Sequence, residues 1–442
     1  MSSHAHTGTE EREHSHRHVE QDMLSVEEAY QRIMASFSPL EPVDMTLLDA
    51  VGHVLAVDVS APLDLPPVAN SGMDGYAVRQ EDIRDASSQS PRLLKVIGLV
   101  AAGHLPDQTV VLGTAVRIMT GAAVPDGADT VVPFEETDEV QRKERGQPLD
   151  EVEIMAALPF GANVRPAGED VSRGQLVLEA GTLLRPAEVG VMASLGMAKV
   201  SVIRSPVVSI LGTGDELVAS GEPLPAGKIY DSNSLSVAAL VQAAGGVPRL
   251  LGIAGDNLED LHRKLEAAAG SDLIVTSAGV SKGDYDIVKE ALIQRGDMNF
   301  WSVRMRPAKP LAFGHLRGAD GKAIPLLGLP GNPVSAMVAF EMFARPAILT
   351  MLGRRRLSRP VVDGVLTSPI YNADGRRVYA RVEVSRRNGT YYASPTGPQG
   401  SNILTSMSRA NGLAICPEDL PSKEAGENVR IIMLDWNEEV DL

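Results

Sequence analysis

The chain has 442 residues, of which 44% are hydrophobic and 22% are charged, a composition typical of a globular protein with several domains. Its formal net charge of −16 argues against a nucleic-acid or anionic-membrane partner, because either partner requires a basic surface. Cys416 is the only cysteine, which excludes a disulfide framework within the chain and a cysteine-rich metal site.

Residues 1–21 are polar and contain five of the nine histidines, including "HSHRH" at 14–18. Metal capture is one interpretation of this segment. We favour a disordered His-rich tail, because nothing in its sequence predicts a scaffold that would fix ligand geometry. The segment lacks the apolar core of a signal peptide, and no run in the chain approaches the roughly 18 apolar residues of a membrane span. We therefore expect a cytoplasmic protein with no membrane partner.

The first half of the chain predicts a helical start and a β-rich insertion. Ser25 and Glu28 have the spacing of a capping box, which predicts a helix within "SVEEAYQRIMASF" at 25–37. Residues 43–59 suggest strand or short helix segments, and "LDLPPV" at 63–68 is a proline-punctuated linker. Residues 63–163 carry short apolar runs separated by Gly, Pro and Asp, which indicates an inserted β-rich domain. Residues 22–62 and 164–204 are similar in style, and we predict that they form one discontinuous N-terminal domain.

The second half alternates strand and helix patterns. Strands are predicted at "PVVSILG", "RLLGIAGD", "DLIVTSAG" and "IPLLGLPG", and each is followed by a helical pattern. This alternation predicts a doubly wound α/β domain with a parallel sheet over residues 205–352. Residues 353–442 have short strands and turns, which predict a small C-terminal β domain. The fold class is therefore multi-domain, with α/β and β parts.

The residues that follow the predicted strands are candidates for a site, because ligands bind at the carboxyl ends of the strands in such sheets. Glycines at helix starts suit phosphate oxygens, and carboxylates there suit Mg²⁺. Asp and Ser after strands are also common helix caps, so each residue taken alone has a structural explanation. The candidates are Asp215, Glu216, Asp256, Ser277, Gly279, Ser281, Asp284, Asp286 and the turn "GLPGNPVS".

Seven segments together resemble the molybdopterin molybdenumtransferase family, which is also similar to the E domain of gephyrin. The resemblance runs from about residue 22 to the C-terminus, and the order of the segments is more specific than any one of them. They are "NSGMDGYAV" (70–78), "RIMTGAAVP" (117–125), "RPAGED" (165–170), "GTGDEL" (212–217), "YDSN" (230–233), "AGVSKGDYD" (278–286) and "LPGNPVSAMV" (329–338).

The resemblance implies an elongated homodimer of four-domain subunits that acts on adenylylated molybdopterin and molybdate. With Mg²⁺ it would release AMP and form molybdenum cofactor. The active site would lie between the α/β domain of one subunit and the inserted β domain of the other. Asp74 would then be presented to the partner subunit by a rigid loop, with Met73 and Tyr76 packing to anchor that loop. Molybdopterin adenylyltransferase and molybdoenzymes are further partners that the resemblance suggests.

The family's functional residues carry over position by position. The residues expected in catalysis are Asp74, Thr120, Asp170, Glu216, Asp256 and Asp286, and those expected to hold Mg²⁺ are Glu216, Asp256 and Asp286. The residues expected to bind substrate or oxyanion are Gly212, Gly214, Asp231, Ser277, Gly279, Ser281, Pro330, Gly331, Pro333, Ser335, Arg306 and Lys309. A basic surface pair beside a capping serine is the structural alternative for Arg306, Lys309 and Ser335.

The chain departs from the family pattern at a few positions, and two other functions stay open. Ala278 stands where the family usually has glycine, Gly72 stands where alanine is common, and Arg306 stands where a lysine is usual. The α/β domain alone is similar to molybdopterin adenylyltransferase, although the flanking domains argue against that activity. A non-catalytic, gephyrin-like scaffold is the other alternative, and the acids retained at every matched position argue against it.

Overall fold

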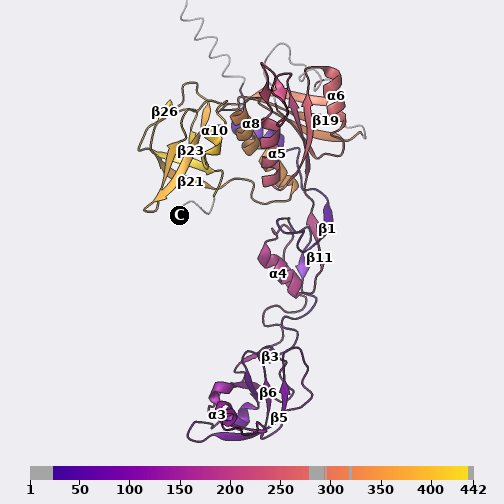
Figure 1. Cartoon of the computed structure of the whole chain (residues 1–442), viewed down its shortest axis with the longest axis vertical. Coiled ribbons are helices and arrows are strands. Elements are labelled where there is room, and N and C mark those ends of the chain that lie inside the picture. The colour runs from indigo at the N-terminus through magenta and orange to yellow at the C-terminus, as the bar shows by residue number, and fades with distance from the viewer. Residues whose placement is uncertain (1–22, 278–292, 294–295, 318–320, 437–442) are drawn as a thin grey trace, which may run out of the picture. The chain divides into compact units, whose positions relative to one another are not determined.

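A computed structural model describes residues 23–277, 293, 296–317 and 321–436 (Figure 1). Among these residues the chain forms two compact units. Unit 1 comprises the residues up to Val43, Gly52–Val54 and the residues from Val202 onward; unit 2 comprises Asp44–Val51 and Leu55–Ser201. The chain passes from one unit to the other in strands β1 (Pro42–Thr46) and β11 (Lys199–Ile203).

Unit 1 contains a six-stranded sheet of order β15-β12-β16-β20-β19-β17. The four strands that the sequence predicted are parallel: β15 (Val247–Ala254), β12 (Val207–Thr213), β16 (Leu273–Ser277) and β20 (Ala323–Leu329). The strands β19 (Pro310–Arg317) and β17 (Gly296–Ser302) are antiparallel and extend the sheet at one edge. Only the parallel part was predicted from the sequence, because no strand pattern was recognised in residues 296–317.

Alternate residues of the parallel strands pack on opposite faces of this sheet. Ile210 belongs to a core shared with α2 (Val26–Met34), α5 (Asn233–Ala243), α8 (Pro333–Ala339) and α9 (Arg345–Met351). The next residue, Leu211, belongs to a second core shared with α6 (Leu258–Glu266). Since helices cover both faces, the predicted doubly wound arrangement is confirmed. The capping box is also confirmed, because Glu28 N–H donates to Ser25 Oγ at 3.1 Å and Ser25 N–H donates to a Glu28 carboxylate oxygen at 3.0 Å.

Helix α8 continues through the π-helical turn η3 (Phe340–Ala344) into α9, giving a helix from Pro333 to Met351. By length and composition alone, this is the one helix among the described residues that could cross a membrane. In the fold, 78% of it is buried inside the protein. Its apolar composition is explained by its place in the core, where it packs against β20 and α5.

The C-terminal part of unit 1 is a closed β-barrel. Its strands are β21 (Val361–Leu366), β23 (Arg377–Arg387), β24 (Thr390–Pro395), β25 (Gly412–Cys416) and β27 (Asn428–Met433). They follow the order β23-β24-β21-β27-β25, and a further pairing of β23 with β25 closes the sheet. The short strand β18 (Met305–Arg306) pairs with β23, so the segment before β19 joins the barrel. The remaining elements are β22 (Ile370–Tyr371), α10 (Thr405–Ser408) and β26 (Ser422–Lys423).

Unit 2 is built on a five-stranded sheet of order β7-β4-β6-β5-β8. These strands are β7 (Thr130–Pro133), β4 (Gly75–Val78), β6 (Thr114–Ile118), β5 (Arg92–Val100) and β8 (Glu151–Ile154). Strand β4 is buried on both faces, with Tyr76 in one core cluster and Ala77 in another. The other elements are β2 (Val59–Ser60), β3 (Asn70–Ser71), η1 (Gln80–Ile83), η2 (Phe134–Glu136), α3 (Glu139–Glu144), β9 (Val164–Arg165), β10 (Leu176–Leu178) and α4 (Pro186–Ser194).

Candidate active site

The carboxyl ends of the parallel strands of unit 1 lie at one edge of the sheet. Gly212 on β12 is in register with Ser277 on β16, and Ser277 is in register with Leu329 on β20. Thr213, at the end of β12, is in register with Ala254 at the end of β15. The links after these four strands therefore begin side by side, which is the placement that the sequence analysis expected of them.

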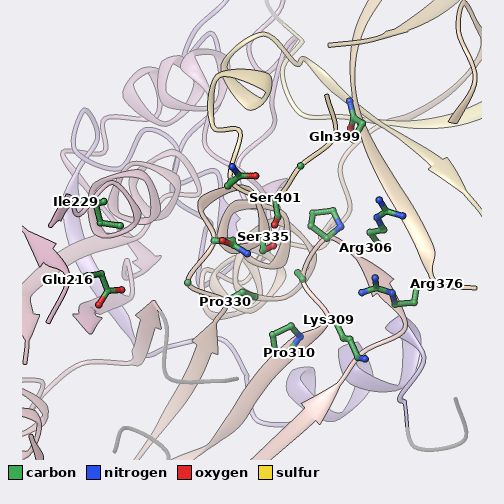
Figure 2. A pocket seen from close by; sticks show the side chains of 16 residues that line it. Glu216, Ile229, Arg306, Lys309, Pro310, Pro330, Ser335, Arg376, Gln399 and Ser401 are labelled. Carbon is green, nitrogen blue, oxygen red and sulfur yellow. The ribbon is translucent and has the colours of Figure 1, made fainter. Parts of the chain in front are cut away.

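A cleft of about 820 Å³ opens at this edge (Figure 2). The link after β12, the loop between β18 and β19, the start of the helix from Pro333, and the barrel loop 399–402 all contribute to its lining. The structure brings six of the predicted residues into the lining, namely Glu216, Arg306, Lys309, Pro330, Gly331 and Ser335. Residues from widely separated parts of the sequence therefore meet at one cleft.

One side of the cleft is basic. Arg306, Lys309 and Arg376 lie together on the side opposite Glu216 and Ile229 (Figure 2). Asp374 pairs with Arg376 and lies 3.9 Å from Arg306. Burial alone would raise the pKa of the Asp374 carboxyl, but the hydrogen bond and charge of Arg376, with the charge of Arg306, hold this pKa below its usual value. Among the described residues, Asp374 pairs with Arg306 and Arg376 but not with Lys309, so this side of the cleft keeps an excess of positive charge and can attract anions.

The backbone of the basic loop is held in an unusual conformation. Ala308 has a φ of 74° and is 4% exposed, so this alanine lies buried in the left-handed region. The carbonyl of Lys309 accepts a hydrogen bond from Val303 N–H at 2.8 Å. The loop therefore has a defined path between β18 and β19, and that path places Arg306 and Lys309 in the cleft.

The start of the long helix is fixed by two neighbouring segments. Asn233 donates from Nδ2 to the Gly331 carbonyl at 2.6 Å, and Val334 N–H donates to the Ser401 carbonyl at 3.1 Å. Pro333 is the first helical residue, a position where the missing N–H has no cost. Ser335 lies in the first turn and is buried. This helix start suits oxyanions, because the positive end of the helix dipole lies there.

The part of the cleft that comes from the barrel was not predicted from the sequence. Arg376, Gln399, Gly400, Ser401 and Asn402 line it, and none of them was a candidate. The Gly-rich stretch "TGPQGSN" at 396–402 was the one local signal for a turn of this kind. Its role depends on the docking of the barrel against the sheet edge, which no sequence pattern predicts.

The barrel loop is held by Arg381, which is 1% exposed. Its guanidinium donates to the carbonyls of Pro398 at 3.3 Å, Gln399 at 3.1 Å and Gly400 at 2.9 Å, and to Ser406 Oγ at 3.0 Å. Burial, with a smaller effect from the charge of Arg306, lowers the pKa of Arg381 to about 10. Arg381 therefore stays charged at neutral pH and fixes the carbonyls next to Ser401.

The predicted acids of unit 1 differ in their surroundings. Asp256 is tied to Asp215: Asp256 N–H donates to Asp215 Oδ1 at 2.9 Å, and Asp215 N–H donates to Asp256 Oδ2 at 3.4 Å. Glu216 lines the cleft, and its carboxylate has no hydrogen bond or ion pair with the described residues. Gly214 has a φ of 133°, a backbone conformation that residues with a side chain rarely adopt, so glycine is favoured at this turn.

Within the described residues, no group of three or more His, Cys, Asp or Glu side chains is placed to hold a metal ion. The third predicted metal ligand, Asp286, lies outside the described residues, as do Gly279 and Ser281. The donor chemistry of Glu216 and Asp256, with hard carboxylate oxygens at the sheet edge, fits Mg²⁺.

The other predicted residues at the sheet edge are buried. Asp231 accepts a hydrogen bond from Ser234 N–H at 3.0 Å, as a helix-capping side chain does, and a Cβ on Gly212 would lie 2.7 Å from its Oδ2. Ser277 Oγ, Thr276 Oγ1 and Ser234 Oγ are buried and make no hydrogen bond within the described part of the chain. Buried hydroxyls of this kind usually have a partner, and for these three none lies among the described residues.

In unit 2 the structure brings Asp74 and Thr120 together. Thr120 donates to Asp74 Oδ1 from its backbone N–H at 2.6 Å and from its hydroxyl at 2.8 Å. The pKa of Asp74 is held below its usual value, chiefly by the hydrogen bond from the Thr120 backbone. The hydrogen bond from the Thr120 hydroxyl and the charge of Arg117 make smaller contributions in the same direction. Asp74 is therefore an exposed, ionised carboxylate in a fixed position. Asp170, the third predicted acid of this unit, is exposed, and its N–H donates to the Leu65 carbonyl at 2.9 Å.

The tight loop around Asp74 has a steric origin. A Cβ on Gly75 would lie 1.9 Å from the Val132 carbonyl oxygen on β7, so only glycine allows the two strands to pair there. Tyr76 is fully buried, in agreement with its expected anchoring role. The same expectation for Met73 was wrong, because Met73 is 40% exposed. Its neighbour Ser71 anchors the loop instead, by donating from Oγ to the Met73 carbonyl at 2.5 Å.

Three family models match the chain in order. They are the MoeA N-terminal region (domain I and II) over residues 24–196, a probable molybdopterin binding domain over residues 209–350, and the MoeA C-terminal region (domain IV) over residues 363–434. Together they span both units.

Curated relatives and solved structures are similar over nearly the whole chain. Molybdopterin molybdenumtransferase 2 of Mycobacterium tuberculosis is 39% identical over 417 residues, covering 92% of this chain and 99% of that protein. The molybdopterin molybdenumtransferase of Haemophilus influenzae is 34% identical, covering 92% of this chain and 98% of that protein. The crystal structure of a molybdopterin biosynthesis MoeA protein from Pyrococcus horikosii matches with a TM-score of 0.80 and 29% identity, covering 93% of this chain and 99% of that one.

Proposed function

Because this chain belongs to the molybdopterin molybdenumtransferase family, we propose that it inserts molybdenum into molybdopterin during molybdenum cofactor biosynthesis. The observation that carries the proposal is the cleft at the sheet edge, which combines a basic side, a helix start and a free carboxylate. We further propose that the substrates are molybdate and adenylylated molybdopterin, and that AMP is released. Both substrates are anions that need hydrogen-bond donors and positive charge.

The basic side of the cleft is the proposed oxyanion site. The side chains of Arg306, Lys309 and Arg376 supply charged donors for molybdate or phosphate oxygens. The start of the helix from Pro333 and the hydroxyls of Ser335 and Ser401 add neutral donors to the same cleft. In a chain with a net charge of −16, this local positive charge is what lets an anionic substrate approach.

Glu216, Asp256 and Asp286 are the proposed ligands of Mg²⁺. Bound there, the ion would supply Lewis-acid stabilisation of phosphate oxygens. Glu216 faces the cleft with its carboxylate free of partners in the described region, which suits a ligand. Asp256 is held by the Asp215 backbone, which fixes the direction of its carboxylate.

The residues of the chain itself have separate proposed tasks in the reaction. The oxyanion site binds molybdate and orients it toward the dithiolene sulfurs. The helix start and the glycine turns bind the phosphates and stabilise the charge that develops when the phosphoanhydride to AMP breaks. Positioning and charge stabilisation of this kind provide most of the catalysis in phosphate chemistry.

We propose that the protein works as a homodimer, with Asp74 and Thr120 of one protomer completing the site of its partner. The support is that this pair forms a fixed, exposed carboxylate in unit 2 rather than a buried structural contact. A subunit-mixing experiment tests this. At molybdate concentrations below KM, the Asp74→Asn and Lys309→Ala proteins should each have low activity alone. Random mixing makes half of the dimers heterodimers, each with one intact site, so the mixture should regain about a quarter of wild-type activity. No regain after confirmed subunit exchange would contradict the shared site.

The first test of the function follows AMP release from adenylylated molybdopterin and Mg²⁺, with and without molybdate. Molybdate-dependent AMP release together with active molybdenum cofactor is the expected result. Formation of adenylylated molybdopterin from ATP and molybdopterin, without AMP release, would assign the adenylyltransferase activity instead. Inactivity in both assays would favour the scaffold.

We also propose a cytoplasmic location, which agrees with a single cysteine that is buried.

A further inference from the structure

Arg117 contacts both the strand that follows Asp74 and the strand that leads to Thr120. It lies on β6, directly opposite Tyr76 on β4. Its Nη1 donates to the Gly75 carbonyl at 3.1 Å and to the Ile118 carbonyl at 2.9 Å. Gly75 directly follows Asp74, and Ile118 lies two positions before Thr120. One guanidinium nitrogen thus bridges the strand that carries the acid and the strand that leads to its donor.

The remaining faces of the guanidinium are also occupied. It stacks over the ring of Tyr76 at 5.4 Å and the ring of Phe134 at 5.8 Å. Phe134 N–H in turn donates to the Asp74 carbonyl at 3.2 Å. Arg117 therefore also contacts the segment that holds the backbone of Asp74 from the other side.

Glu139 holds Arg117 in this position. The Glu139 side chain is 2% exposed, and its Oε2 lies 2.7 Å from Arg117 Nε. Lys143 donates to Glu139 Oε1 at 2.6 Å. Burial alone would raise the pKa of Glu139, but the hydrogen bonds from Lys143 and Arg117 hold this pKa below its usual value. The ion pair is therefore charged at neutral pH. The planar guanidinium of Arg117 contacts the Glu139 carboxylate and two backbone carbonyls at the same time.

We propose that Arg117, held by Glu139, is a positioning residue for molybdenum insertion, because it fixes the Asp74 carboxylate against Thr120. This inference rests on the proposed function of the Asp74–Thr120 pair, and it adds that the Arg117–Glu139 ion pair sets the geometry of that pair. A lysine cannot replace Arg117, since one ammonium group cannot reach Gly75, Ile118 and Glu139 together in the same plane.

The test compares Arg117→Lys with wild type in the molybdate-dependent AMP-release assay. We expect kcat to fall about 100-fold, the loss typical of a misplaced group, while KM for molybdate changes less than about two-fold. Arg92→Lys is the matched control, because Arg92 lies in the same unit and its one ion pair with a described residue is with the exposed Asp85. Glu139→Gln tests the same Arg117–Glu139 ion pair by removing the charge of the carboxylate, and it provides a second variant if Arg117→Lys does not fold.

A double-mutant cycle separates positioning from a general loss of structure. In an Asp74→Asn background, Arg117→Lys or Glu139→Gln should lower kcat by less than about three-fold, since the group that they position is already disabled. A loss of the same size in both backgrounds would overturn the proposal, as would an unchanged kcat in the wild-type background. Inactive wild-type protein would instead refute the proposed function.

The exchange rate of the Thr120 amide hydrogen is a readout independent of activity: it should rise at least ten-fold in Arg117→Lys, and an unchanged rate would overturn the proposal.

Discussion

Thr120 donates two hydrogen bonds to a single oxygen of Asp74, one from its backbone at 2.6 Å and one from its hydroxyl at 2.8 Å. Both donors favour the ionised carboxylate, so the pKa of Asp74 lies below its usual value. Their stabilising contribution is therefore present above the ordinary pKa of an aspartate. It is lost as the pH falls through the lowered pKa of the folded protein.

The lowered pKa of Asp74 leads to a prediction for Thr120→Val, a substitution that removes the hydroxyl donor and keeps the backbone donor. The pKa of Asp74 should move up toward its ordinary value, so the acid limb of the kcat/KM profile should move to higher pH. Thr120→Ser keeps the hydroxyl and is the control. The measurement is AMP release as a function of pH for all three proteins. An acid limb that stays in place in Thr120→Val would show that Asp74 is not the titrating group.

Gly75→Ala should destabilise unit 2, because the new Cβ would lie 1.9 Å from the Val132 carbonyl oxygen. The strands β4 and β7 would have to separate, at a cost of about 1–3 kcal/mol. Gly72→Ala is the matched control in the same loop, since the nearest atom to its Cβ would be 3.4 Å away. Hydrogen exchange of residues 70–78 and 130–133 would report the difference. Equal exchange in the two variants would contradict the steric explanation of Gly75.

Lys309→Ala should weaken molybdate binding. A hydrogen bond to a charged group contributes about 1.5–3 kcal/mol, so KM for molybdate should rise roughly 10- to 100-fold. Arg263→Ala is the control, because Arg263 is an exposed cation on α6 that pairs with Asp260 and does not line the cleft. Steady-state kinetics with varied molybdate would test this. If Lys309→Ala lowered kcat with KM unchanged, the side chain would act on the transition state instead.

Arg381→Met should loosen the barrel loop. It would leave three carbonyls and the Ser406 hydroxyl without their buried donor, at a cost of about 2–4 kcal/mol. Arg387→Met, at the exposed end of the same strand, is the control. Hydrogen exchange over residues 396–402 should rise in Arg381→Met, and KM for molybdate should rise with it. Normal exchange in this segment would show that the loop holds its shape without Arg381.

Sequence reasoning predicted the parts of the fold that depend on local patterns. The capping box at Ser25 and the alternation that places Gly212, Ser277 and Leu329 at one edge follow from short stretches, whereas the oxyanion candidates Arg306 and Lys309 came from the family resemblance. It missed Arg376, Arg381 and Ser401, because their role depends on where the barrel docks. It also missed the antiparallel strands β17 and β19 and the exposure of Met73. Such features depend on contacts between segments far apart in the chain, which periodicity does not contain. The domain boundaries expected at residues 62, 163, 204 and 352 stay a prediction.

The segment around the basic loop belongs to two sheets at once. Arg306 ends a strand of the barrel sheet and Pro310 begins a strand of the α/β sheet, with only residues 307–309 between them. The partner of β18 is β23, which is synthesised well after the α/β strands. A nascent chain can therefore form the sheet edge first and gain the donors of Arg306, Arg376 and Ser401 only when the barrel closes. The cleft is thus completed by residues that are synthesised after the α/β domain, and a chain that stopped before the barrel would lack the side chains of Arg376 and Ser401.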